Sequence, residues 1–131
     1  MARILLVDDE WDVCDFMLRF FEERHFEVFT AMSGSDALLS AERDRPNIIL
    51  LDIRMKDMSG IEVLKRIKRI NIDARVVMVT CVDDIEAMKE AKDLGAAAYI
   101  TKPLVLNDLM EVVLGSLGRR RNFFNFRRRF K

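Results

Sequence analysis

The chain has 131 residues, 50% of them hydrophobic, so it is long enough for one domain with a real core and too apolar for wholesale disorder. No apolar stretch approaches the roughly 18 residues of a membrane span, the N-terminus shows no signal-peptide pattern, and Cys14 and Cys81 lack the spacing of a zinc site or a disulfide framework. The 22 basic and 22 acidic side chains balance, yet residues 1–118 hold all the acids and only 15 of the Lys and Arg residues. We therefore predict a cytoplasmic, acidic domain at 1–118 and a basic, aromatic tail at 119–131.

The first part of the domain has the pattern of strand, helix, strand and helix. Apolar runs predict strands at 4–7 and 26–30. Between them, apolar residues three and four positions apart predict one buried helix face, made of Val13, Phe16, Met17 and Phe20. Ser33 and Asp36 have the spacing of an N-terminal helix cap, so the second helix is expected to start there.

The same alternation continues to about residue 117. Further apolar runs predict strands at 48–51, 76–79 and 97–100. Ser59 and Asp83 each precede a glutamate by three residues and are expected to start the next two helices, the second of which ends at Gly95. The last helical face is predicted to hold Leu106, Leu109, Met110 and Val113. Strands that are apolar throughout are typical of a parallel sheet covered on both faces, which predicts an α/β, doubly wound (βα)5 domain.

Polar residues follow several of these strands directly. In such a sheet, side chains just past the carboxyl ends of the strands gather in one crevice, which would bring together Asp8, Asp9, Asp52, Thr80 and Lys102. Three neighbouring carboxylates raise the pKa of at least one of them, and a hard divalent cation such as Mg²⁺ relieves the repulsion. The lysine and the hydroxyl suit phosphoryl oxygens. Asp52, on the middle strand, is then the candidate nucleophile toward phosphorus.

These residues resemble the receiver domain of two-component response regulators, and the resemblance spans residues 3–117. Supporting matches are Met55, Ser59-Gly60, Gly95-Ala96 and Tyr99. The resemblance implies a flavodoxin-like sheet with strand order 2-1-3-4-5 and five helices. It also implies a signalling domain that accepts a phosphoryl group on Asp52 from a histidine kinase or a histidine phosphotransfer protein, with no turnover chemistry beyond gaining and losing that group.

The resemblance further implies roles for the metal and the phosphate. Asp9 and Asp52, with the backbone carbonyl of Arg54, would ligate Mg²⁺, and Asp8 would act mainly through bound water. Thr80 and Lys102 would hold the phosphoryl oxygens. The cofactor expected for this domain is therefore Mg²⁺ alone.

Two more features follow from the resemblance. The peptide bond between Lys102 and Pro103 would be cis, which only an X–Pro bond adopts readily. Tyr99 would turn inward when Thr80 is drawn to the phosphate. This switch would change the face built by the fourth helix, the fifth strand and the fifth helix, through which a downstream effector or a second copy of the chain would bind.

Five positions depart from the pattern of the family, and one of them is Val105, which replaces a more typical capping residue before the last helix. Lys56 stands where proline is usual, so we expect a less rigid loop after Asp52. Cys81 replaces a smaller residue and is expected to pack beside the site and narrow access to it. Arg54 and Val82 occupy positions that tune how long the aspartyl phosphate lasts, in a direction that the sequence leaves open.

Other readings stay open at this point. A Mg²⁺-dependent phosphatase with an aspartate nucleophile usually has a DxD arrangement after the first strand, which the run Asp8-Asp9-Glu10 does not fit. A receiver-like scaffold that takes no phosphate is a further alternative.

Two segments outside the acid cluster could bind partners. The first helix could offer a kinase-docking surface on an exposed side made of Trp11, Cys14, Asp15 and Leu18. The tail at 119–131 is a disordered extension or linker remnant, or binds nucleic acid or an anionic membrane.

Overall fold

A parallel β-sheet organises the domain. The computed structural model describes residues 2–70, 73–81 and 84–118, so the predicted tail, together with Val82 and Asp83, lies outside the described residues. The strands are β1 (Arg3–Val7), β2 (Glu27–Ala31), β3 (Ile48–Asp52), β4 (Arg75–Thr80) and β5 (Ala98–Thr101). They lie in the order β2-β1-β3-β4-β5, and each neighbouring pair is parallel. The predicted fold class and strand order are confirmed.

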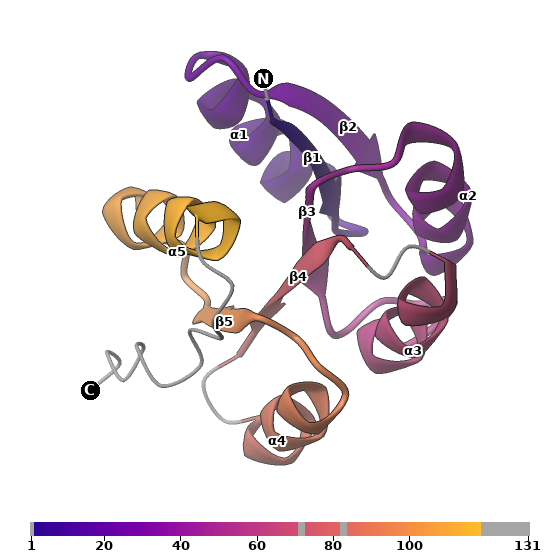
Figure 1. Ribbon diagram of the computed structural model, residues 1–131. Coiled ribbons are helices and arrows are strands. Elements are labelled where there is room, and N and C mark those ends of the chain that lie inside the picture. The colour runs from indigo at the N-terminus through magenta and orange to yellow at the C-terminus, as the bar shows by residue number, and fades with distance from the viewer. Residues whose placement is uncertain (1, 71–72, 82–83, 119–131) are drawn as a thin grey trace.

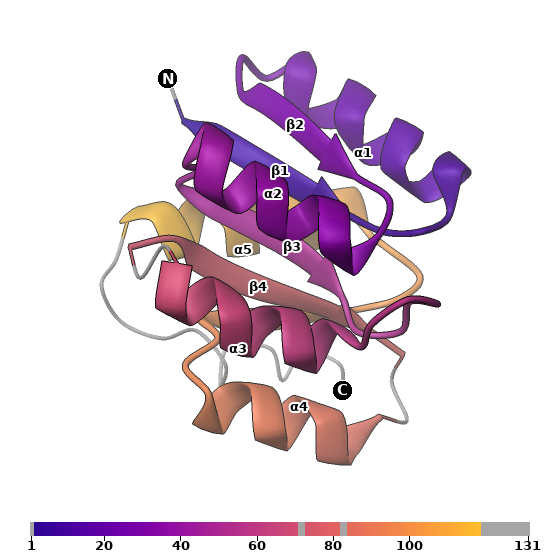
Figure 2. The ribbon, with the colours of Figure 1, turned by 90° about the vertical axis from the view of Figure 1, so that its right-hand side faces the viewer.

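Helices cover both faces of the sheet. The helices α1 (Trp11–Glu22) and α5 (Leu106–Gly118) lie on one face (Figure 1). The other face carries α2 (Gly34–Asp44), α3 (Gly60–Ile70) and α4 (Ile85–Asp93), which stand in a row in Figure 2. No helix within the described ranges combines the length and the apolar character needed to cross a membrane.

Strand β3 lies between two apolar clusters, and every one of its residues is buried. Ile49 and Leu51 belong to the cluster beneath α2, α3 and α4, whereas Ile48 and Leu50 belong to the cluster beneath α1 and α5. Alternate side chains of a strand point to opposite faces, so a sheet covered on both sides needs apolar residues at consecutive positions. This burial explains the continuous apolar run that predicted the strand.

The buried face of helix α1 agrees with the prediction at Met17 and Phe20 and differs from it elsewhere. Its buried residues are Cys14, Met17, Phe20 and Phe21. The prediction was wrong for Phe16, which is 45% exposed, and for Cys14, which is fully buried with its thiol donating to the backbone carbonyl of Asp8 at 3.4 Å. Phe21, which the predicted face did not include, packs edge-on against Phe26 before β2, with ring centroids 5.2 Å apart.

The predicted helix boundaries are confirmed with one correction. Ser33 and Ser59 both accept a backbone N–H on the side-chain oxygen, each at 3.1 Å, as N-caps do. The N-cap of α4 is Asp84, which makes no side-chain capping bond, instead of the predicted Asp83. Gly95 follows the end of α4 with a φ of +97°, the left-handed conformation that glycine adopts without strain.

Candidate functional site

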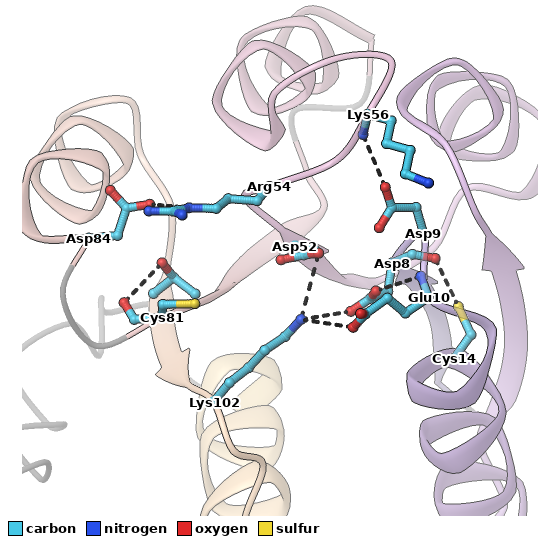
Figure 3. A network of polar contacts seen from close by, with 11 residues as sticks. Asp8, Asp9, Glu10, Cys14, Asp52, Arg54, Lys56, Cys81, Asp84 and Lys102 are labelled. Carbon is cyan, nitrogen blue, oxygen red and sulfur yellow. Dashed lines mark hydrogen bonds and ion pairs between the residues drawn. The ribbon is translucent and has the colours of Figure 1, made fainter.

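Three carboxylates meet at the carboxyl end of the sheet (Figure 3). Asp8 and Asp9 follow β1, and Asp52 is the last residue of the neighbouring strand β3. One carboxylate oxygen from each residue lies within 4.8 Å of the other two. Asp8 and Asp52 are 1% and 5% exposed, whereas Asp9 is partly exposed. The topology thus brings together three acids that are up to 44 residues apart in the sequence.

Lys102 supplies the positive charge of this cluster. It follows β5, and its backbone N–H donates to the Thr80 carbonyl at 2.8 Å. The ammonium Nζ lies 3.3 Å from Oδ2 of Asp8, 3.7 Å from Oδ2 of Asp52 and 4.0 Å from Oε1 of Glu10. A single ammonium therefore faces several acids, and the cluster keeps an excess of negative charge.

The pKa values of Asp52 and Lys102 are both raised in this site. Burial, followed by the charge of Asp8, raises the pKa of Asp52 from 3.8 to about 6, although Lys102 and a backbone hydrogen bond from Arg54 partly oppose the rise. For Lys102, burial is the largest single influence and favours a lower pKa. The negative charges of Asp52 and Asp8 together outweigh burial, so the pKa of Lys102 is raised overall. The pKa of Asp52 is raised as expected, but burial contributes more to the rise than the neighbouring carboxylates do.

The two predicted switch residues, Thr80 and Tyr99, lie on the neighbouring strands β4 and β5. Thr80 ends β4 one residue beyond Val79, the register partner of Asp52, and its buried hydroxyl donates to the Cys81 carbonyl at 3.3 Å. Tyr99 lies on β5, half-buried against the apolar cluster beneath α2, α3 and α4. Cys81 is exposed, so the expectation that it packs was wrong.

The loop that follows Asp52 is tied to its surroundings by contacts that the sequence did not reveal. The backbone N–H of Lys56 donates to Oδ2 of Asp9 at 3.0 Å. The carboxylate of Asp57 accepts the N–H groups of Gly34 and Ser35, at 2.8 and 3.1 Å, in the first turn of α2, and these bonds lower its pKa. Neither contact has a local signal, because both depend on the path of the loop.

Glycine is required where this loop enters α3. A Cβ atom on Gly60 would lie 2.2 Å from the backbone oxygen of Asp52 and 2.7 Å from the Cα of Ile53. Both neighbours are backbone atoms, so no side chain can move aside to make room. Gly60 therefore lets the start of α3 pack directly against the end of β3, and it belongs to the residues that shape the site.

An ion pair crosses the rim of the site. The guanidinium of Arg54, in the loop after β3, lies 3.3 Å from the carboxylate of Asp84 at the start of α4. Figure 3 shows this side chain running toward α4 and away from the acid cluster. The Arg54 side chain is 67% exposed, so the pair contributes little to stability.

A surface pocket of about 330 Å³ opens next to Lys102. It lies between α1 and the segment after β5, and its lining residues are Asp12, Val13, Phe16, Lys102, Pro103 and Leu104. The peptide bond between Lys102 and Pro103 is cis. Trp11, on the same helix, is 56% exposed. Apolar side chains are therefore available to a partner immediately beside the acid cluster.

Comparison with known proteins gives a consistent result. The family model of the response regulator receiver domain matches residues 4–114. The chain is 32% identical over 111 residues to sporulation initiation phosphotransferase F of Bacillus subtilis, covering 85% of this chain and 90% of that protein. It is 35% identical over 118 residues to the transcriptional regulatory protein PrrA of Mycobacterium tuberculosis, covering 90% of this chain but 51% of PrrA, so it spans about half the length of that relative.

Solved structures agree with this result. A CheY-like response regulator receiver domain protein from Methanospirillum hungatei JF-1 superposes with a TM-score of 0.86 at 32% identity, covering 89% of this chain and 94% of that one. Chemotaxis protein CheY4 of Vibrio cholerae superposes with a TM-score of 0.84 at 28% identity, covering 89% and 99% of the two chains. The chain therefore belongs to the family of response regulator receiver domains of two-component signalling.

Proposed function

We propose that this domain accepts a phosphoryl group on the carboxylate of Asp52, from the phosphohistidine of a histidine kinase or a histidine phosphotransfer protein in the cytoplasm. The observation that carries the proposal is the position of Asp52. Its side chain is 7% exposed, and its carboxylate belongs to a cluster of three acids within 4.8 Å and lies 3.7 Å from the ammonium of Lys102. A nucleophile, sites for a cation and a phosphate-binding lysine are thereby adjacent.

The donor set of the cluster fits Mg²⁺. Carboxylate oxygens are hard ligands, and a small cation with few protein ligands and several waters suits a site with three converging acids. Asp9 and Asp52, with the backbone carbonyl of Arg54, would hold the ion, and Asp8 would act through a bound water. When bound, Mg²⁺ supplies positive charge that neutralises the phosphoryl oxygens.

The protein groups have separate roles in the transfer. A carboxylate oxygen of Asp52 forms the bond to phosphorus while the bond from phosphorus to the donor nitrogen breaks, and the imidazole leaves. Lys102 exchanges part of its contact with the carboxylates for the incoming phosphoryl oxygens. The hydroxyl of Thr80 leaves the Cys81 carbonyl, to which it now donates, and turns to the phosphate. The outcome is an aspartyl phosphate that the domain itself later hydrolyses.

The response is proposed to pass through the face made of α4, β5 and α5. Tyr99 is half-buried on β5, on the same face of the sheet as α4. Because β5 pairs with β4, a movement of Thr80 at the end of β4 can change the packing around Tyr99. A downstream effector or a second copy of the chain would then bind this face. Physically, the phosphoryl charge biases an element that has two arrangements.

The phosphodonor is proposed to dock on the surface formed by α1 and the segment after β5. Val13, Phe16 and Leu104 line a pocket that also includes Lys102, so a partner seated there places its phosphohistidine beside the acid cluster. Trp11 extends the apolar part of this surface. Cys14, which the sequence suggested for the same surface, is buried and takes no part in it.

The proposal is tested by incubating the chain with acetyl phosphate and Mg²⁺ and measuring its intact mass. The wild type should gain one phosphoryl group, and Asp52→Asn should gain none. Asp93→Asn, which changes an exposed aspartate at the end of α4, is the matched control and should still be labelled. An unlabelled wild type contradicts the proposal. Repeated turnover of a phosphomonoester would instead support the phosphatase alternative, and absence of Mg²⁺ binding the scaffold alternative.

A further inference from the structure

Each acid of the cluster is held by a hydrogen-bond donor, and the donor to Asp9 is a backbone amide. Asp8 accepts the Glu10 N–H at 2.9 Å on Oδ1 and the ammonium of Lys102 at 3.3 Å on Oδ2. Asp9 accepts the N–H of Lys56 at 3.0 Å on Oδ2, across the opening between two loops (Figure 3). Lys56 lies in the loop after β3, 47 residues from Asp9 in the sequence.

Asp9 is the member of the cluster that most needs such a donor. The carboxylates repel one another, and Asp8 and Asp52 are too deeply buried to turn into water. Asp9 is partly exposed, so rotation of its side chain toward solvent would relieve the repulsion at little cost. A hydrogen bond to a charged oxygen is among the stronger ones in proteins and opposes this rotation.

The amide of Lys56 is itself fixed by the loop. The next residue, Asp57, is bound to the N–H groups of Gly34 and Ser35 in the first turn of α2. At the far end of the loop, Gly60 packs against the backbone oxygen of Asp52. The loop that carries the Lys56 N–H is therefore tied to α2 and to the end of β3, so the N–H can hold the Asp9 carboxylate in one orientation.

We propose that the backbone N–H of Lys56 is a positioning group for the Mg²⁺ site, an inference that rests on the proposed function. It keeps Asp9 turned into the cluster, so that the three carboxylates converge before a cation arrives. Lys56 stands at a position where proline is usual in the family. Proline has no N–H, so this chain carries a donor that the usual pattern lacks.

The experiment compares Lys56→Pro with Lys56→Ala. Both variants remove the same ammonium, and only proline removes the N–H. Mg²⁺ affinity is measured by titration, with the fluorescence of Trp11, the single tryptophan of the chain, as the signal. We expect Lys56→Ala to bind Mg²⁺ within about twofold of the wild type and Lys56→Pro to bind it on the order of tenfold more weakly, because one charge-assisted hydrogen bond is lost.

Hydrogen exchange of single amides separates positioning from general damage to the loop. The Lys56 amide should be protected in the wild type both without and with Mg²⁺, and Asp9→Ala should remove this protection. In Lys56→Pro the amides of Gly34 and Ser35 should stay protected, which shows that the loop is still anchored to α2. Loss of that protection would mean that the weaker affinity reflects a displaced loop, and would overturn the positioning role.

Two further results would also overturn the inference. Equal Mg²⁺ affinity of Lys56→Pro and Lys56→Ala, in a wild type that binds the ion, contradicts it while leaving the proposed function intact. Deprotection of the Lys56 amide by Mg²⁺, together with tighter binding by Lys56→Pro, would show that the amide competes with the metal. A wild type that binds no Mg²⁺ overturns this inference and the metal role in the proposed function together.

Discussion

Charged side chains are paired at one end of the sheet and crowded together at the other. At the amino end, Arg3, Arg45 and Arg75 each donate to a backbone carbonyl, at 3.1, 3.2 and 3.2 Å. These carbonyls lie in the last turns of α2, α3 and α5, where unpaired C=O groups and the helix dipole favour positive charge. The amino end thus pairs each of these charges with a complementary partner.

At the carboxyl end, charges of one sign are crowded instead. Asp8, Asp9 and Asp52 each bring one carboxylate oxygen within 4.8 Å of the others, and the ammonium of Lys102 lies near Asp8 and Asp52. Burial and the charge of Asp8 together raise the pKa of Asp52. This end is less favourable for folding than an apolar end would be, but it is prepared for a cation and a phosphoryl group. The charges at the amino end therefore stabilise the fold. The crowded carboxylates at the carboxyl end destabilise it but are placed to bind a cation and a phosphoryl group.

The largest expected effect comes from breaking the backbone contact beneath the acids. Gly60→Ala places a methyl group 2.2 Å from the backbone oxygen of Asp52, so either β3 or the start of α3 must shift. We expect a loss of about 3 kcal/mol in the free energy of unfolding, together with weaker Mg²⁺ binding. Urea denaturation and Mg²⁺ titration measure both. Gly118→Ala is the control, because no atom of the described residues lies within 4 Å of the added methyl group. Equal stability of the two variants would contradict the close packing at Gly60.

A second prediction concerns the unfavourable charge itself. The pKa of Asp52 is raised from 3.8 to about 6 on folding, so the ionised carboxylate destabilises the metal-free fold. This effect is absent below the unfolded pKa, grows between pH 4 and 6, and is complete above that range. Asp52→Asn should therefore be more stable than the wild type by about 2 kcal/mol at neutral pH, and the difference should vanish in acid.

The matched control for this prediction lies at the other end of the sheet. A hydrogen bond from Arg43 lowers the pKa of Asp44, so its carboxylate contributes stability that is present at neutral pH and lost as the pH falls. Asp44→Asn should accordingly destabilise at neutral pH, with the opposite sign to Asp52→Asn. Urea denaturation in the presence of EDTA over a pH series tests both variants. An Asp52→Asn variant less stable than the wild type at neutral pH would contradict the account.

The smallest expected changes in the free energy of unfolding come from replacing one arginine at each end of the sheet. Arg3→Met removes the donor to the partly buried Asp44 carbonyl and should lower the free energy of unfolding by about 1 kcal/mol. Arg54→Met breaks the exposed pair with Asp84 and should change it by less than about 0.5 kcal/mol. Thermal and urea denaturation measure the two variants side by side. A larger loss from Arg54→Met than from Arg3→Met would reverse the assignment of stabilising roles.

The sequence predicted the sheet because both of its faces are covered. Strands such as β3 then need apolar residues at consecutive positions, a pattern that solvent-facing strands do not show. The buried face of α1 was harder, since apolar side chains at Cys14, Phe16 and Phe21 allow more than one stripe. Which stripe is buried depends on the packing of α1 against the rest of the domain, of which the contact of Phe21 with Phe26 is one part. Tertiary contacts of this kind have no local pattern.

The same distinction applies to the site. The cluster of Asp8, Asp9, Asp52 and Lys102 follows from topology, because parallel strands deliver their last residues to one edge. The donor to Asp9 could not be predicted, because every residue except proline has a backbone N–H and only the path of the loop directs it. The capping of α2 by Asp57 depends on that path as well.

The most direct test of the account is to locate the phosphoryl group within the chain. The wild type is treated with acetyl phosphate and Mg²⁺, the acyl phosphate is reduced with borohydride, and the peptides are sequenced by mass spectrometry. The account predicts conversion of aspartate to homoserine at position 52 and at no other aspartate of the cluster. Conversion at position 8 or 9, or an unmodified chain, would contradict the claim that the carboxyl end of the sheet is organised around Asp52.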